Sequence, residues 1–132
     1  MGRPRERYTP AVDEVASVPV LDIRTYRLVP GGRDELDRIV REGALPMLDR
    51  YGIQVVCSGP SLEDDEHYCL VRAFASAPHR EEALDSFYGS DEWRSTYREA
   101  VLGLIVAYHT VVIPLTPSIG TALTSASARP DA

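Results

Sequence analysis

The sequence predicts an α+β protein with a ferredoxin-like order of elements, strand, helix, strand, strand, helix, strand, in a four-stranded antiparallel sheet. Three observations carry this prediction. Residues 20–28 alternate like a strand, residues 33–51 and 78–104 have helical periodicity, and residues 53–58 and 67–75 form a strand pair around a polar turn. A last strand-like run at 105–115 completes the order.

The composition is that of an ordinary globular domain. The chain has 132 residues, of which 44% are hydrophobic and 26% charged, which suits one domain with a modest core. The formal net charge of −6 disfavours nucleic-acid binding, which needs a clustered basic face. No apolar run reaches the roughly 18 residues of a membrane span, and the N-terminus lacks the apolar segment of a signal peptide. We therefore expect a cytoplasmic protein that binds neither nucleic acid nor membrane.

The two ends of the chain differ in composition from its middle. Residues 1–18 contain proline and mixed charge with few large aliphatic side chains, which predicts a flexible arm. Residues 116–132 are rich in Ser, Thr, Ala and Pro, which predicts a flexible tail. The folded domain is therefore expected at residues 19–115. All 14 basic residues are arginine, which excludes any mechanism that needs a lysine Schiff base.

Local signals define the boundaries of the elements. In the first helical region Gly43 and Pro46 interrupt the apolar periodicity and predict a kink or a break near residue 44. Ser76 and Ser90 are predicted to cap the two later helices, with Gly89 between them. If the strand pair is symmetric about its acidic loop, Cys57 and Cys69 lie opposite one another.

Short motifs along the domain resemble the landmarks of the NIPSNAP family. The motifs are Leu21-Asp22-Ile23-Arg24-Thr25-Tyr26, Pro30-Gly31, Leu45-Pro46-Met47-Leu48 before Tyr51-Gly52, Ser90-Asp91-Glu92-Trp93, and Pro114-Leu115 followed by Pro117-Ser118. They extend over residues 20–119, nearly the whole predicted domain. The chain departs from the family pattern in its third strand, where Arg72 stands near a position expected to be aromatic.

The resemblance implies a dimeric α+β barrel, in which the sheets of two subunits face each other and the helices cover the outside. The wider superfamily contains cofactor-free monooxygenases and cyclases of aromatic polyketides, haem-degrading enzymes, and small proteins with no known activity. The fold does not choose among these functions. In such proteins ligand cavities usually lie between a subunit's sheet and its own helices, and the first strand is central in the sheet.

A central first strand buries the charges of Asp22 and Arg24, and an unpaired buried charge costs several kcal/mol. Two interpretations stay open. Asp22 and Arg24 lie two residues apart on one face, so they can pair with each other or across a dimer. Alternatively, Arg24 binds a ligand together with Tyr26.

Histidines on the strands beside the first one are candidate general bases. An imidazole titrates near neutral pH and needs only hydrogen-bond reach to the reacting atom. His109 lies deeper in its strand than His67 and is the first choice, while a structural, hydrogen-bonded role is the alternative for both. Cys57, Cys69 and His67 can share a hairpin face, but their spacing matches no zinc motif, so we expect no metal.

The functional hypothesis that follows is a homodimer that binds a small organic molecule, aromatic or polyketide-like, and acts as an enzyme without a cofactor. The reaction is an oxygenation, a cyclisation or an isomerisation begun by proton abstraction. The candidate catalytic residues are His109, Arg24 and His67. The candidate substrate-binding residues are Asp22, Tyr26, Arg72, Trp93, Tyr97 and Tyr108. The aromatic members of this set, with Phe87 and Tyr88, can equally be core residues.

Two other classes of function remain open from the sequence. One is a non-catalytic dimeric module whose interior is filled by side chains and whose Arg24 is bidentate to a carboxylate. The other is a haem-handling protein, for which His67 or His109 would have to project into a haem-sized slot.

Overall fold

The computed structural model describes residues 18–119 and 121. Nearly all of the predicted arm at 1–18 and most of the predicted tail at 116–132 lie outside the described residues. Within the described part, no helix has both the length and the apolar character that a membrane crossing requires.

The elements follow the predicted order, and the fold is ferredoxin-like α+β. Two π-helical segments, η1 and η2, lie within the helical regions. The elements in chain order are β1 (Val20–Leu28), α2 (Arg33–Ile39), η1 (Val40–Ala44), α3 (Leu45–Arg50), β2 (Gln54–Pro60), β3 (His67–Phe74), α4 (Ala77–Tyr88), η2 (Trp93–Tyr97), α5 (Arg98–Leu104) and β4 (Ile105–Pro114). The sheet has the strand order β2-β3-β1-β4 and is antiparallel throughout. The first strand is therefore interior, as predicted.

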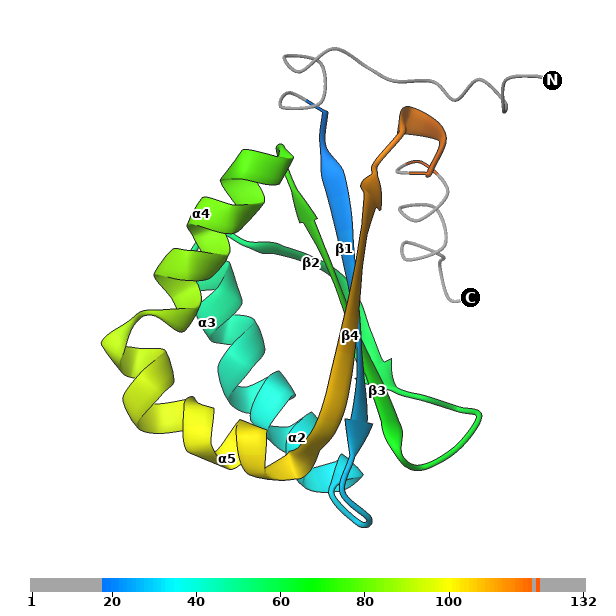
Figure 1. Ribbon diagram of the computed structural model, residues 1–132, viewed down its shortest axis with the longest axis vertical. Helices are drawn as coiled ribbons and strands as arrows, with labels where there is room; N and C mark the ends of the chain where they lie inside the picture. Colours follow the sequence, from blue (N-terminus) through cyan, green and yellow to red (C-terminus); the bar gives the residue numbers. More distant parts are fainter. Residues whose placement is uncertain (1–17, 120, 122–132) are drawn as a thin grey trace, which may run out of the picture.

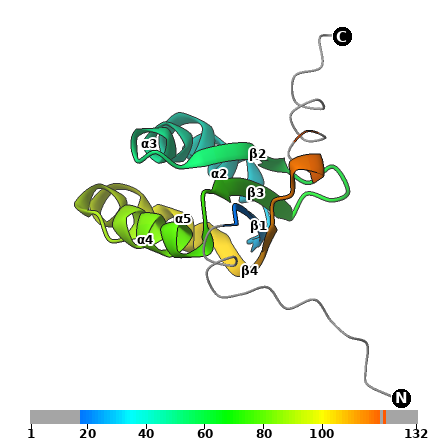
Figure 2. The ribbon, with the colours of Figure 1, turned by 90° about the horizontal axis from the view of Figure 1, so that it is seen from above.

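The helices α2 to α5 all cover one face of the sheet, so the molecule has two layers (Figures 1 and 2). Alternate residues of β1 point into this helix layer, and Val20, Asp22 and Leu28 are buried there. The core between the layers has two parts. One is built around Met47, Leu70, Phe74, Phe87 and Trp93, and the other around Leu28, Leu36, Val40 and Tyr68.

The opposite face of the sheet carries none of these helices, and we call it the open face. It consists of Leu21, Ile23, Thr25 and Arg27 of β1 together with the residues in register with them on β3 and β4. Most of its residues are apolar, namely Leu21, Ile23, Cys69, Val71, Ala73, Ala107, Val111 and Ile113. Leu21 and Val71 are buried, whereas Val111 is 45% exposed.

The first helical region does not break at Gly43 and Pro46. It continues from α2 through the π-helical segment η1 into α3, with Pro46 in the first turn of α3. Proline lacks an amide donor, and a π-helical turn is one way in which a helix accommodates a disrupted bonding pattern. Gly43 in η1 lies against the ring of Tyr97 in η2, where a Cβ atom would overlap the ring. The two π-helical segments therefore meet at a residue that has no side chain.

Other local predictions are confirmed. The Ser76 hydroxyl accepts a hydrogen bond from the amide of His79 at the start of α4 (3.1 Å), and the Ser90 hydroxyl accepts one from the amide of Trp93 (3.2 Å). The predicted pairing of the cysteines is wrong. Cys57 lies opposite Val71, and Cys69 lies opposite Gly59. The strands are offset relative to a symmetric hairpin on both sides of the bulge between Val55 and Cys57, because Val55 before it already pairs with Arg72.

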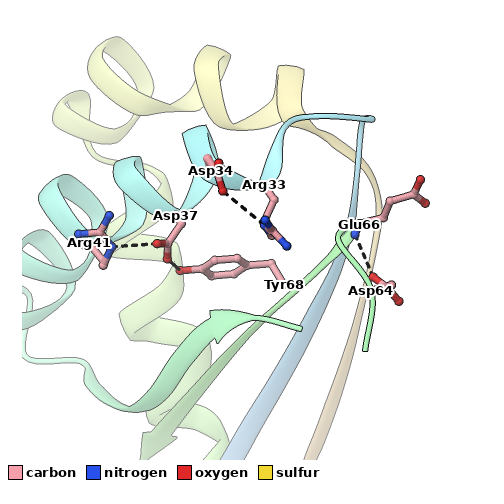
Figure 3. A network of polar contacts seen from close by, with 7 residues as sticks. All are labelled: Arg33, Asp34, Asp37, Arg41, Asp64, Glu66 and Tyr68. Atoms are coloured by element: carbon pink, nitrogen blue, oxygen red, sulfur yellow. Dashed lines mark hydrogen bonds and ion pairs between the residues drawn. The ribbon is translucent and has the colours of Figure 1, made fainter. Parts of the chain in front are cut away.

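A polar network fastens α2 to the sheet (Figure 3). The Tyr68 hydroxyl of β3 donates to Asp37 of α2 over 2.7 Å, and the Arg41 guanidinium donates to the other carboxylate oxygen over 2.9 Å. Burial and the neighbouring Asp37 carboxylate raise the pKa of Tyr68, so its hydroxyl stays protonated and remains a donor. The helix layer is thus held to the sheet by a charge-assisted bond as well as by apolar packing.

Candidate functional site

A pocket of about 400 Å³ lies between the sheet and the helices α4, η2 and α5, and we call it the sheet–helix pocket. β1 and β4 supply its floor and the helices its walls. Its lining residues are Arg24, Tyr26, Leu84, Asp85, Tyr88, Trp93, Arg98, Val101, Leu102, Ile105 and Tyr108. This volume is within the range of sites for small organic molecules, and the mixture of apolar walls with a few polar groups is typical of them.

Arg24 places a positive charge on the floor of the pocket. Its Nε donates to the Thr110 hydroxyl over 2.9 Å, and its guanidinium lies 4.9 Å from the centre of the Tyr108 ring. Both partners are neutral, and among the described residues no carboxylate lies within ion-pair distance of Arg24. Arg24 therefore retains donors and charge for a group that enters the pocket.

Tyr26 lies beside Arg24 on the same face of β1 and remains a neutral phenol. Burial is the largest cause of its shifted titration, followed by the proximity of Tyr88, and together they raise the pKa of Tyr26 to about 12. The positive charge of Arg24 acts in the opposite direction but does not cancel these effects. At neutral pH Tyr26 can therefore donate a hydrogen bond.

The rings of Tyr88 and Trp93 form part of the helical wall of the pocket, and other aromatic rings pack behind them. The ring of Tyr88, the last residue of α4, stands nearly perpendicular to the Trp93 ring with their centres 5.0 Å apart. Trp93 is also 5.5 Å from Phe87 and 5.9 Å from Tyr97. Edge-to-face and tilted pairs of this kind hold each other in place. The wall is therefore a firm surface for a flat apolar ligand.

A buried ion cluster lies behind the pocket. Asp22 accepts from Arg72 Nη2 over 3.1 Å and from Arg80 Nε over 2.6 Å. Asp22 and Arg72 are fully buried, and the Arg80 side chain is 19% exposed. Of the alternatives that the sequence leaves open, a pair between Asp22 and Arg24 of one subunit is therefore not formed. Asp22 faces Arg72 directly across the β1–β3 pair, and α4 brings Arg80 onto its second oxygen.

The ion cluster is connected to the pocket by a hydrogen bond to one hydroxyl group, that of Tyr88. Arg72 Nη1 donates to the Tyr88 hydroxyl over 3.0 Å, while Arg72 Nε has no hydrogen-bond partner in the described part of the chain. Asp22 and Arg72 do not line the pocket themselves. Their contribution to it is to fix Tyr88.

The structure does not bring the predicted bases to the pocket. His109 is in register with Thr25, so it lies on the open face, opposite to Arg24 and Tyr26. His67 lies at the hairpin end of β3, where its Nδ1 is 3.0 Å from the Asp64 carboxylate. One pocket of one subunit therefore cannot combine His109 with Arg24 as base and anion stabiliser.

Of the predicted substrate-binding residues, Tyr26, Trp93 and Tyr108 come together with Arg24 in the pocket. Tyr97 lines a separate, smaller cavity beside Gly43. Tyr88 and Arg98 line the pocket but were not among the predicted site residues. The aromatic spacing of α4 and η2 already marked Tyr88 in the sequence, whereas nothing in it marked Arg98. In the described residues, no group of three or more His, Cys, Asp or Glu side chains is arranged to hold a metal ion.

Comparison with known proteins identifies relatives by sequence pattern and by fold. The NIPSNAP family model matches residues 21–118. No curated protein sequence matches the chain. A NIPSNAP-like domain protein from Burkholderia xenovorans superposes with a TM-score of 0.70 at 12% identity, over 76% of this chain and 88% of that one.

Two further solved structures show how widely the fold is shared. A NIPSNAP family protein from Agrobacterium tumefaciens has a TM-score of 0.67 at 17% identity, over 76% of this chain and 88% of that one. A protein from Bacteroides thetaiotaomicron, provisionally assigned as an antibiotic biosynthesis monooxygenase, has a TM-score of 0.57 at 17% identity, over 76% and 90%. At these identities the likeness concerns the fold alone.

Proposed function

The chain belongs to the NIPSNAP family, and from this premise we propose that it binds a small aromatic or polyketide-like molecule between its sheet and its helices α4 and α5. The observation that carries this proposal is the sheet–helix pocket of about 400 Å³, in which the rings of Tyr88 and Trp93 on the helical wall face a floor that contains Arg24. Aromatic walls suit a flat ligand because they offer a large contact area at low conformational cost.

The same pocket weighs against the two other classes of function. A non-catalytic assembly module would have a filled interior and would pair Arg24 with a carboxylate, but the partner of Arg24 is the Thr110 hydroxyl. A haem-handling protein would direct a histidine into the cavity. Neither His67 nor His109 is among the residues that line the pocket.

Catalysis without a cofactor is the second candidate function. It is favoured by Arg24, which can stabilise an anion formed when a proton is removed from a bound substrate. A monooxygenase assignment among proteins of the same fold is compatible with such chemistry. Since His109 lies on the other face of the sheet, an oxygenation, cyclisation or isomerisation in this pocket would use a different base.

We also propose that the protein is a homodimer, joined through the open face. A sheet with apolar residues on both faces is stable in water when both faces are covered. The helices cover one face, and a second copy can cover the other through a two-fold, self-complementary contact. The exposed Val111 would be buried in this interface.

The pocket can be tested directly because Trp93 is the only tryptophan of the chain and lines the pocket. A neutral three-ring probe, 2-(hydroxymethyl)anthraquinone, is expected to quench the Trp93 fluorescence saturably with one site per chain. Val101→Phe fills the pocket and should weaken this binding by roughly tenfold or more, since overpacking costs about 1–3 kcal/mol.

The matched control is Val112→Phe. Val112 is 40% exposed and does not line the pocket, so this variant should bind the probe as the wild type does. Linear, non-saturating quenching that is the same in all three proteins would contradict the proposed binding function.

A further inference from the structure

The Tyr88 hydroxyl joins the sheet–helix pocket to the buried ion cluster. Arg72 Nη1 donates to this hydroxyl over 3.0 Å, and Tyr88 itself lines the pocket. A phenol carries one proton, and that proton cannot be directed at Arg72, because a guanidinium is a donor only. Among the described residues, no acceptor takes a hydrogen bond from Tyr88. Its proton is therefore available to a group in the pocket.

The cluster behind Tyr88 has an excess of positive charge. It contains the guanidinium groups of Arg72 and Arg80 against the single carboxylate of Asp22. Arg72 is fully buried, so its charge is weakly screened by solvent. The field of the cluster therefore favours negative charge next to the Tyr88 hydroxyl.

Two more donors lie on the floor of the same pocket. The terminal nitrogens of Arg24 have no carboxylate partner in the described part of the chain. Tyr26 stays protonated, since burial raises its pKa to about 12. Asp85 is the one carboxylate among the lining residues, and it is exposed. The pocket thus offers more donors than the protein's own acceptors occupy.

We propose that the pocket takes its aromatic ligand through an oxyanion, a carboxylate or an enolate, which accepts hydrogen bonds from Arg24 and Tyr88, and that Arg72 is a positioning residue that holds Tyr88 as a donor. This inference rests on the proposed function, because it names the ligand class of the same pocket. It also gives the Arg72 side chain, which departs from the aromatic residue of the family pattern, a specific part in ligand recognition.

The test compares two probes of the same ring system, anthraquinone-2-carboxylate and the neutral 2-(hydroxymethyl)anthraquinone, by quenching of Trp93. The carboxylate should bind roughly tenfold or more tightly, because a hydrogen bond to a charged group contributes about 1.5–3 kcal/mol. Tyr88→Phe should remove about tenfold of the carboxylate affinity and leave the neutral probe within about twofold. Tyr51→Phe, which lies outside the pocket, should change neither.

The outcomes separate this inference from the proposed function. If both probes bind equally, the pocket stands and the oxyanion site is overturned. If neither probe binds, the proposed function fails, and the inference fails with it.

Arg72→Lys tests the positioning role. Lysine retains the charge but loses the planar fork that reaches Asp22 and Tyr88 together. We expect this variant to lose the same carboxylate affinity as Tyr88→Phe, with no further loss in the double variant. If the role of Arg72 were purely structural, Arg72→Lys would weaken the binding of both probes, and its effect would add to that of Tyr88→Phe. That result would overturn the assignment. Arg72→Gln, which retains an amide donor, serves the same comparison if the lysine variant does not fold.

Discussion

The Asp37 carboxylate of α2 accepts hydrogen bonds from Tyr68 in the sheet and from Arg41 in the helix layer. Burial disfavours its ionised form, but the hydrogen bonds from Tyr68 and Arg41 outweigh burial and hold the pKa of Asp37 below its ordinary value. A carboxyl group with a lower pKa in the folded chain stabilises the fold above the unfolded pKa. That contribution is lost as the pH falls through the folded pKa.

We predict that Asp37→Asn lowers the free energy of unfolding at neutral pH by about 1–2 kcal/mol, because it removes the charge from two hydrogen bonds. The difference from the wild type should shrink as the pH falls below about 4. Urea unfolding at a series of pH values measures both effects. Asp34→Asn is the control, since the Asp34 side chain is 93% exposed and should contribute little. A difference that stays constant with pH would rule out the linkage.

For the residues of the site, the sequence predicts which side chains share a face of β1, but it does not predict which residues pair with each other. The alternation of β1 correctly places Asp22, Arg24 and Tyr26 on one face. The partner of Asp22 on α4 lies 58 residues away, at Arg80, and no local pattern links the two positions. The sequence does not tell which face His109 occupies, because the facing of a strand residue depends on the register, and a shift of one residue reverses it. The register with Thr25 places it on the open face.

The helices show which element features depend on local sequence. Ser76 and Ser90 could be recognised as caps because a capping hydroxyl acts within three residues of itself. The π-helical segments η1 and η2 could not be predicted in the same way. Gly43 and Pro46 mark an irregularity in the sequence, but its form depends on Tyr97, which packs against Gly43 from another helix.

We predict that Gly43→Ala destabilises the fold by about 1–3 kcal/mol, because the new Cβ must displace the Tyr97 ring. Since Tyr97 packs on Trp93, the emission of Trp93 should shift as well. Gly103→Ala in α5 is the matched control. A Cβ there meets no atom within 4 Å, so alanine should stabilise the helix by about 0.5–1 kcal/mol. Equal effects at the two glycines would contradict the packing argument.

The layered architecture of the whole molecule followed from the order of its elements. A strand, helix, strand, strand, helix, strand sequence with short connections leaves few arrangements, and the observed sheet order β2-β3-β1-β4 is the ferredoxin-like one. The order of the elements does not predict what covers the open face, because this depends on a second surface. The sequence of one chain supplies that information only through the resemblance to the family.

The proposed dimer makes a prediction at this scale. Val111→Asp places a charge on the open face and should convert the dimer to a monomer, because an unpaired charge in an interface costs several kcal/mol. Val112→Asp is the matched control, since Val112 is similarly exposed, 40% against 45%, but points to the other face of the same strand. Sedimentation velocity measures the mass of each variant. A wild-type monomer, or dimers of both variants, would refute the proposed interface.

The direct opposition of Asp22 and Arg72 across β1 and β3 also has a consequence for how the chain selects its strand alignment. In any pairing slipped by one residue, Asp22 would face Val71 or Ala73, and Arg72 would turn to the open face. The buried Asp22 carboxylate would then lose its partner on β3, at about 3–5 kcal/mol. Misaligned sheets are therefore penalised at one position near the start of the strand. Arg24 and Tyr26 follow Asp22 on the same face, so the ion pair that excludes wrong alignments also sets where the floor of the pocket forms.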